Sequence, residues 1–178
     1  MDDLCAHITD IVANSISAGA KKIMVFIEMS KSRNILSLKI TDNGKGMDKE
    51  TAAKVVDPFY STKTGRKVGL GIPLLKGTAE TCGGSFKLSS KEGIGTEIEV
   101  TLLMDHPDLP PLGKLKDTIL ISSVSNPETY FSYYIKTDDK NFLFDIEEIN
   151  IILDGLPIND PEVIKFLTKY LDENLEFI

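Results

Sequence analysis

Hydrophobic residues alternate with polar ones along several stretches of this chain, and elsewhere they recur every three or four positions. The second spacing predicts a first helix from about Asp3 to Ala18. Strict alternation then predicts two strands, KIMVFIEM and NILSLKIT, which the polar turn SKSRN joins as an antiparallel hairpin. A short helix from about Asp48 to Val55, a longer one within GLGIPLLKGTAETCGG, and the strands SFKLSS and TEIEVTLL follow in order.

The proline-rich stretch DHPDLPPLG, residues 105–113, predicts a boundary between two parts of the chain. After it, TYFSYYIK and NFLFDI predict a second hairpin, while LKDTILISSVS fits a helix or a strand, and we favour the helix. The segment NDPEVIKFLTKYLDE predicts a final helix. Its expected apolar face holds Val163, Phe166, Leu167, Tyr170 and Leu171.

These elements predict an α+β protein in which helices cover one side of a mixed, mostly antiparallel sheet, forming a two-layer α/β sandwich. We expect a domain at residues 1–104, a linker at 105–113 and a small α+β accessory domain at 114–178. A chain of 178 residues can bury one good core.

Charge and composition narrow the possible environments and partners. The formal net charge of −7 argues against nucleic acid as a partner, because phosphate backbones attract basic surfaces. No apolar run has the length of a membrane span, and the start Met1-Asp2-Asp3 lacks a secretory signal, so we expect a cytoplasmic protein without a membrane partner. The oligomeric state stays open.

The stretch ITDNGKGMD contains the first candidate for chemistry. The alternation of the preceding strand places Asp42 on the apolar face, where a carboxylate needs hydrogen-bond donors. Thr96 begins a later strand and points to the same face. Together they form a hydrogen-bonding pair suited to a flat polar ring such as adenine, whose amine would donate to Asp42. Gly44 and Gly46 would let the backbone approach that ring and turn sharply.

Two further features predict a place for phosphates. Asp10, Asn14 and Ser17 stack on one side of the first helix, where their oxygens can hold a hydrated magnesium ion. In KTGRKVGLGIP, glycines including Gly69 and Gly71 leave backbone amides bare where a helix begins, and helix amino termini bind phosphate.

These motifs together resemble those of the GHKL superfamily of ATP-binding proteins, which includes gyrase, heat-shock chaperones, histidine kinases and MutL. DIVANSISAGA is similar to the N box, DNGKGM to the DxGxG box, and VDPFYSTK with GRKVGLGI to the F and G2 boxes of sensor histidine kinases. The resemblance implies an ATP site with Mg2+ bound by Asn14, the adenine amine at Asp42, and Thr96 assisting through water. It further implies a short lid over Phe59 to Val68 and Lys63 at the phosphates. The nucleotide-binding residues implied are Asn14, Asp42, Gly44, Gly46, Met47, Phe59, Lys63, Gly69, Leu70, Gly71 and Thr96.

One departure from the family pattern bears on catalysis. Gyrase and MutL have a glutamate that activates water four residues before the magnesium asparagine, histidine kinases usually have an asparagine, and this chain has Asp10. Asp10 is therefore the candidate general base, or else it is only a solvated side chain at the edge of the helix with no catalytic role.

Two classes of function follow. The first is a histidine kinase-like enzyme that transfers the ATP γ-phosphoryl group to a separate protein partner, because the chain shows no phosphoaccepting histidine motif, or that hydrolyses ATP. The second is a non-catalytic, ATP-dependent switch that binds a partner protein, similar to anti-sigma factors.

Overall fold

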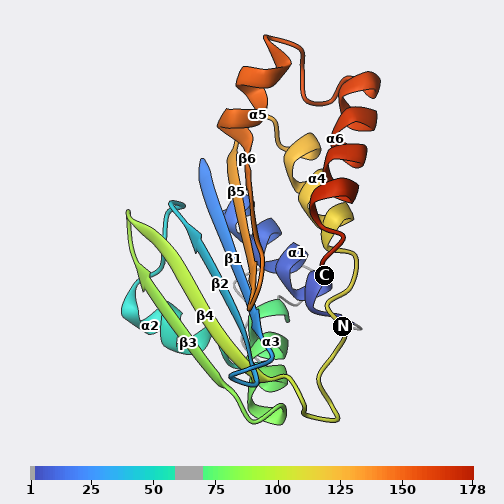
Figure 1. Cartoon of the computed structure of the whole chain (residues 1–178). Coiled ribbons are helices and arrows are strands. Elements are labelled where there is room, and N and C mark those ends of the chain that lie inside the picture. The colour runs from blue at the N-terminus through green and yellow to red at the C-terminus, as the bar shows by residue number, and fades with distance from the viewer. Residues whose placement is uncertain (1–2, 59–69) are drawn as a thin grey trace.

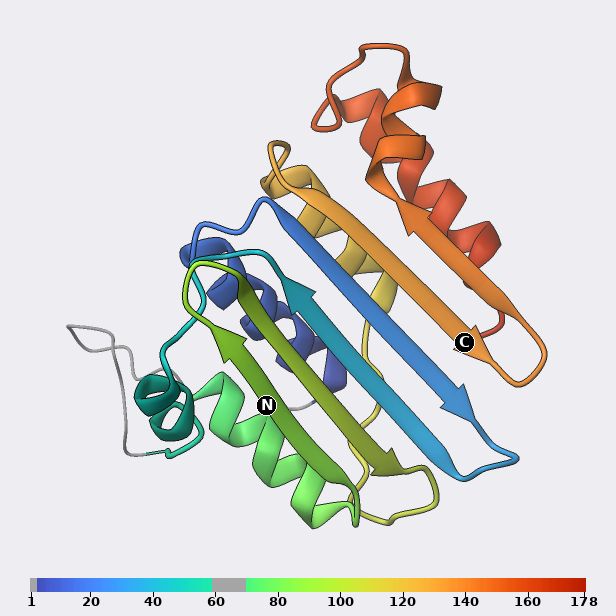
Figure 2. The same ribbon diagram turned by 90° about the vertical axis from the view of Figure 1, so that its left-hand side faces the viewer.

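Six strands form one sheet, and helices pack on one of its faces (Figure 1). The computed structural model describes residues 3–58 and 70–178. The elements are α1 (Leu4–Ser17), β1 (Lys22–Ser30), β2 (Ile35–Asp42), α2 (Lys49–Lys54), α3 (Gly71–Thr81), β3 (Ser85–Lys91), β4 (Gly95–Leu103), α4 (Leu115–Ser125), β5 (Tyr130–Thr137), β6 (Asn141–Asp145), α5 (Ile146–Leu153) and α6 (Pro161–Asn174). Figure 2 looks onto the sheet face that the helices leave open, with α1, α3, α4 and α6 behind it.

The strand order is β3-β4-β2-β1-β5-β6, and every neighbouring pair is antiparallel except β1 and β5, which are parallel. This confirms the predicted α+β class with a mixed, mostly antiparallel sheet. It also confirms the helix in LKDTILISSVS. Inward side chains of the central strands and the apolar stripe of α1 are buried in one core, which includes Leu4, Ile8, Ile11, Val12, Leu36, Leu38 and Ile40.

The segment after residue 104 continues the sheet of the first part. β5 pairs along the whole of β1, from Lys22 opposite Tyr130 to Met29 opposite Thr137. The proline-rich stretch contacts the start of α1. There the Leu4 amide donates to the Pro111 carbonyl and the Cys5 amide to the Leu112 carbonyl, both at a distance of 2.9 Å. Those amides have no partner inside their own helix, so the stretch satisfies them. The division into separate domains stays a prediction, and strands of both parts lie in one sheet.

In the carboxyl-terminal part, one helix was not predicted from the sequence, and one residue expected on the buried face of another helix is exposed. A helix, α5, follows β6 without a break, because Asp145 ends the strand and accepts a hydrogen bond from the Glu147 amide at 2.8 Å as the helix cap. In α6, Val163, Leu167 and Leu171 are buried as expected, whereas Phe166 is 43% exposed. The buried stripe of α6 is therefore narrower than the apolar pattern indicates. No helix in the described ranges is long and apolar enough to cross a membrane.

One carboxylate ties the β5–β6 turn to the β1–β2 turn. Asp138 accepts hydrogen bonds from the Ser30 hydroxyl at 2.6 Å, the Ser32 hydroxyl at 3.0 Å and the Ser32 amide at 2.9 Å. These donors, the Ser30 hydroxyl foremost, lower the pKa of Asp138 to about 2. The ionised form therefore helps to hold the two hairpins together.

We predict that Asp138→Asn lowers the free energy of unfolding at neutral pH, because the amide lacks the charge that strengthens these hydrogen bonds. A group with a depressed folded-state pKa contributes its stability above the unfolded-state pKa and loses it as the pH falls towards the folded-state value. The difference between wild type and variant should thus shrink as the pH falls from about 5 towards about 2. Urea denaturation at several pH values measures it, with Asp139→Asn in the same turn as control. A difference that does not change with pH would contradict this role.

Candidate functional site

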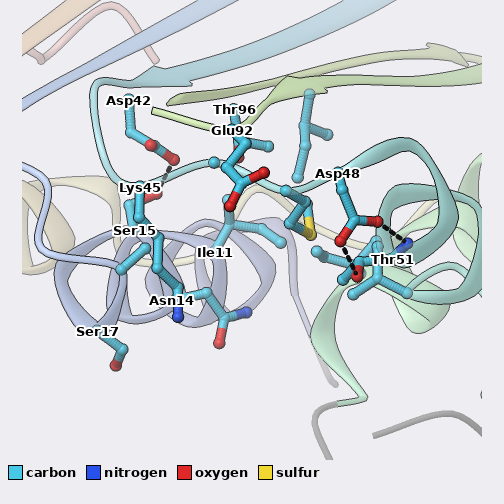
Figure 3. Close-up of a pocket in the computed structure, with 16 residues that line it drawn as sticks. Ile11, Asn14, Ser15, Ser17, Asp42, Lys45, Asp48, Thr51, Glu92 and Thr96 are labelled. Atoms are coloured by element: carbon cyan, nitrogen blue, oxygen red, sulfur yellow. Dashed lines mark hydrogen bonds between the residues drawn. The ribbon is translucent and has the colours of Figure 1, made fainter. Parts of the chain in front are cut away.

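A cavity of about 590 Å³ opens beside α1 and α2, where β2 ends and β4 begins (Figure 3). Its size is within the range of small-molecule sites. Apolar side chains from α1, α3, β4, the turn before α2 and the residue that ends α2 form much of its wall: Ile11, Met47, Val55, Ile72 and Ile98. The polar and charged side chains that line it are Asn14, Ser15, Ser17, Asp42, Lys45, Asp48, Thr51, Glu92 and Thr96. An apolar wall with a few polar groups suits a flat, partly polar ligand.

Asp42 is the last residue of β2, and its carboxylate is held from two sides. The Ser15 hydroxyl of α1 donates to Oδ2 at 2.6 Å, and the Gly44 amide donates to Oδ1 at 2.8 Å. Each carboxylate oxygen has a further lone pair, so the side chain can accept from a ligand while it remains fixed in place. The acid predicted on the inward face thus has its donors, and it lines the cavity.

Ser15 is a site residue that the sequence analysis missed. It lies four positions after Ile11 on the buried stripe of α1 and is only 4% exposed. A hydroxyl on an otherwise apolar stripe was the available signal, because a buried polar group needs a hydrogen-bond partner.

Thr96 pairs with Asp42 across β2 and β4, as its inward position predicts. The Thr96 hydroxyl is 2.9 Å from Ser90 Oγ, which accepts from the Met47 amide at 2.9 Å and lies 3.0 Å from the Gly95 carbonyl. A carbonyl can only accept, so Ser90 donates its one hydrogen there, and Thr96 must donate to Ser90. The Thr96 oxygen therefore presents lone pairs, and the pair of side chains offers acceptors side by side.

The two glycines of DNGKG lie where a side chain would collide with other parts of the chain. A Cβ on Gly44 would come within 3.0 Å of the Ala18 Cβ. Gly46 has φ of +64°, and a Cβ there would lie 2.0 Å from the Lys91 carbonyl oxygen. The turn after β2 can pack closely against Ala18, at the end of α1, and against Lys91, at the end of β3, only because these two residues lack side chains.

The predicted stripe on α1 is divided between two places. Asn14 and Ser17 line the cavity, although Ser17 is exposed and donates to the Ala13 carbonyl at 2.7 Å. Asp10 is not among the described residues that line the cavity. Its carboxylate lies against Gly71, the first residue of α3, where an added Cβ would fall 1.6 Å from Oδ2. A carboxylate at a helix amino terminus interacts favourably with the helix dipole.

Lys45 was also missed, and it is the only cationic side chain among the described residues that line the cavity. Figure 3 shows it beside Asn14, on the side of the cavity opposite Asp48 and Thr51. Asp48 caps α2 by accepting from the Thr51 amide at 2.7 Å, and this hydrogen bond lowers its pKa. Glu92, from the β3–β4 turn, is the third acid of the lining, besides Asp42 and Asp48.

The remaining predicted nucleotide-binding residues lie between positions 59 and 71 of the chain. Phe59, Lys63 and Gly69, with the proposed lid from Phe59 to Val68, lie outside the described residues. Leu70 precedes α3 and is 39% exposed, and Gly71 begins that helix. Ile72, the next residue, reaches the cavity.

Comparison with known proteins gives one family match. The family model described as "Histidine kinase-, DNA gyrase B-, and HSP90-like ATPase" matches residues 2–106. The sensor histidine kinase YvrG of Bacillus subtilis is 30% identical over 95 residues, which cover 51% of this chain and 16% of that protein. Sporulation kinase C of the same organism is 32% identical over 93 residues, covering 52% of this chain and 22% of the kinase. The chain thus spans about a fifth of these relatives.

Two solved structures share the fold. One is described as the N terminal domain of a DNA repair protein, with a TM-score of 0.54 and 20% identity, covering 80% of this chain and 52% of the other. The other is the Aquifex aeolicus MutL ATPase domain complexed with ADP, with a TM-score of 0.50 and 17% identity, covering 86% and 70%. At these identities the likeness concerns the fold alone.

We predict that Ser15→Ala lowers the free energy of unfolding by about 1.5–3 kcal/mol, because Asp42 loses a charge-assisted donor that the buried alanine cannot replace. Chemical denaturation measures this loss. Ser17→Ala on the same helix removes an exposed hydroxyl and should cost less than about 0.5 kcal/mol. Equal effects of the two substitutions would show that the Ser15 hydroxyl does not hold Asp42 in solution.

Proposed function

The chain belongs to the family of histidine kinase-, DNA gyrase B- and HSP90-like ATPases, and from this premise we propose that ATP binds in the cavity around Asp42. We further propose that the protein transfers the γ-phosphoryl group to a separate protein partner, or to water, in the manner of a histidine kinase. The observation that carries the proposal is the inward Asp42 carboxylate, held by two donors at the edge of an apolar-walled cavity.

The adenine ring has a place that fits its chemistry. Its exocyclic amine would donate to Asp42, whose position is fixed before any ligand arrives. Thr96 would accept from a water molecule that bridges to the ring. The flat faces of the ring would pack against the apolar wall, which includes Ile11, Ile72 and Ile98.

The phosphates would lie toward Asn14 and Lys45. Asn14 offers an amide oxygen at the cavity. Within residues 3–58 and 70–178 there is no group of three or more acidic, histidine or cysteine side chains that could hold a metal ion by itself. This fits Mg2+, which keeps several waters and uses few protein ligands besides nucleotide phosphates. Bound there by Asn14, the ion would neutralise phosphate charge, and Lys45 would add a second positive charge. Lys63, Gly69, Leu70 and Gly71 complete the phosphate site that we propose.

The place of Asp10 bears on the choice between transfer and hydrolysis. Its carboxylate packs against Gly71 at the start of α3 and lies outside the described cavity lining. A general base must come within reach of the water it activates. This arrangement favours transfer to a partner over hydrolysis, with Asp10 positioning the amino terminus of α3 beside the phosphates.

A second candidate function is a non-catalytic switch that binds a partner when ATP is present. This function is favoured because two helices contribute side chains to the cavity wall. Thr51 lies in α2 and Val55 at its end, and Ile72 lies in α3. A nucleotide in the cavity would contact both helices that flank residues 59–69. Binding could then change the surface around them without any chemical step.

Asp42→Asn should weaken ATP binding about 100-fold or more, because the variant loses the charge-assisted contact with the adenine amine. Calorimetry measures the Kd, and circular dichroism checks that the variant is folded. Asp172→Asn, at an exposed ion pair with Lys116, is the matched control and should bind ATP as the wild type does. An unchanged affinity of Asp42→Asn would refute the assignment.

Incubation with γ-labelled ATP and Mg2+ tests the chemical step, using the protein alone and with proteins encoded beside it. We expect label on a partner protein, little free phosphate, and no transfer without Mg2+. Asp10→Asn should keep ATP affinity within about threefold, because the amide has the same shape as the carboxylate that packs against Gly71 and lies outside the described cavity lining. Intact ATP in every reaction would overturn the enzymatic proposal and support the switch.

A further inference from the structure

Helix α5 is apolar on two sides, and only one side is covered. Ile146, Ile149 and Leu153 are buried against the rest of the molecule, whereas Ile151 is 79% exposed and Ile152 is 61% exposed. Leu156, three residues after the helix, is 59% exposed. Exposed apolar side chains that are grouped together, unlike single ones, mark interaction sites. We call Ile151, Ile152 and Leu156, with the acids around them, the α5 surface.

Acidic side chains surround this apolar group. Residues 141–164 contain six acids and no lysine or arginine. Glu147, Glu148 and Asp154 are exposed, and within the described ranges no ion pair involves any of them. The charge is also segregated along the chain, because residues 114–178 hold 13 acidic and 6 basic side chains while residues 1–113 hold 14 of each. The whole excess negative charge lies in the part that carries α5.

The α5 surface lies at the opposite side of the molecule from the nucleotide cavity. α5 follows β6, which is one edge strand, whereas α2 lies beside β3, the other edge strand (Figures 1 and 2). Asp154 and Gly155 both have positive φ, 46° and 88°, and end the helix in a turn that leads to Leu156. A partner bound at α5 would therefore leave the cavity open.

We propose that the α5 surface docks a basic amphipathic segment of a protein partner. The apolar side chains would take the hydrophobic face of such a segment, and Glu147, Glu148 and Asp154 would pair with its lysines or arginines. A second copy of this chain fits less well, because a twofold contact would bring the acids of both copies together. Anionic lipid and nucleic acid would be repelled by the same charges.

This inference depends on the proposed function only in assuming that a protein partner exists. The test is a fluorescently labelled helical peptide of leucine and lysine, titrated with the full chain in the absence of nucleotide and followed by anisotropy. A matched peptide with glutamate in place of lysine is the control ligand. We expect saturable binding of the lysine peptide, no binding of the glutamate peptide, and weaker binding as the salt rises from about 0.05 to about 0.3 M.

Variants locate the binding site. Ile151→Ser with Ile152→Ser should weaken peptide binding about tenfold or more, whereas Ile94→Ser, at a similarly exposed isoleucine in the β3–β4 turn, should leave it unchanged. Glu147→Gln with Glu148→Gln should weaken binding and reduce its salt dependence.

Three outcomes would overturn the proposal: equal binding of both peptides, loss of binding in Ile94→Ser to the same extent, or self-association that the double isoleucine variant abolishes. The last outcome, measured by sedimentation velocity, would make a second copy the occupant. Asp42→Asn should bind the peptide as the wild type does, so failure at the α5 surface and failure of ATP binding can be told apart.

Discussion

The Asp42 carboxylate and its two donors join three elements of the structure at the edge of the cavity. A half-buried carboxylate without donors is costly, and here the Ser15 hydroxyl and the Gly44 amide supply them at 2.6 and 2.8 Å. One donor comes from α1 and the other from the turn after β2. The carboxylate therefore fixes a helix, a strand end and a turn relative to one another. The cavity lies beside that junction, and the same acid faces it.

The sequence predicted the direction of a strand residue, Asp42, better than it predicted the contacts of the helix residue Ser15 and the turn residue Lys45. Strand alternation has a period of two, so the buried positions Leu36, Leu38 and Ile40 fix the direction of Asp42. The helical period likewise places Ser15 on the same face of α1 as Ile11. Its hydrogen-bond partner, however, depends on how α1 crosses the sheet, and no local sequence pattern predicts that crossing. Lys45 lies in a turn, where no period exists, and the chain path through Gly44 and Gly46 decides where it points.

Similar reasons explain which parts of the fold were missed. The parallel pairing of β1 with β5 joins residues about a hundred positions apart, and strand patterns do not reveal such pairings. α5 was missed because β6 passes into it at Asp145 with no glycine or proline between them. Phe166 lies one residue from Leu167 at the border of the α6 stripe, where periodicity cannot separate a buried from a half-exposed position.

The division of charge along the chain bears on both proposed binding sites. ATP is an anion, and three acids, Asp42, Asp48 and Glu92, already line the cavity beside Lys45. Further negative charge near the cavity would oppose nucleotide binding. Residues 1–113, which form the cavity, hold equal numbers of acidic and basic side chains, and the excess acid lies beyond them. At physiological salt, exposed charges farther apart than about 8 Å are largely screened from one another. The acids at α5, beyond the other edge strand, can therefore attract a cationic segment without adding to the negative charge that a nucleotide meets at the cavity.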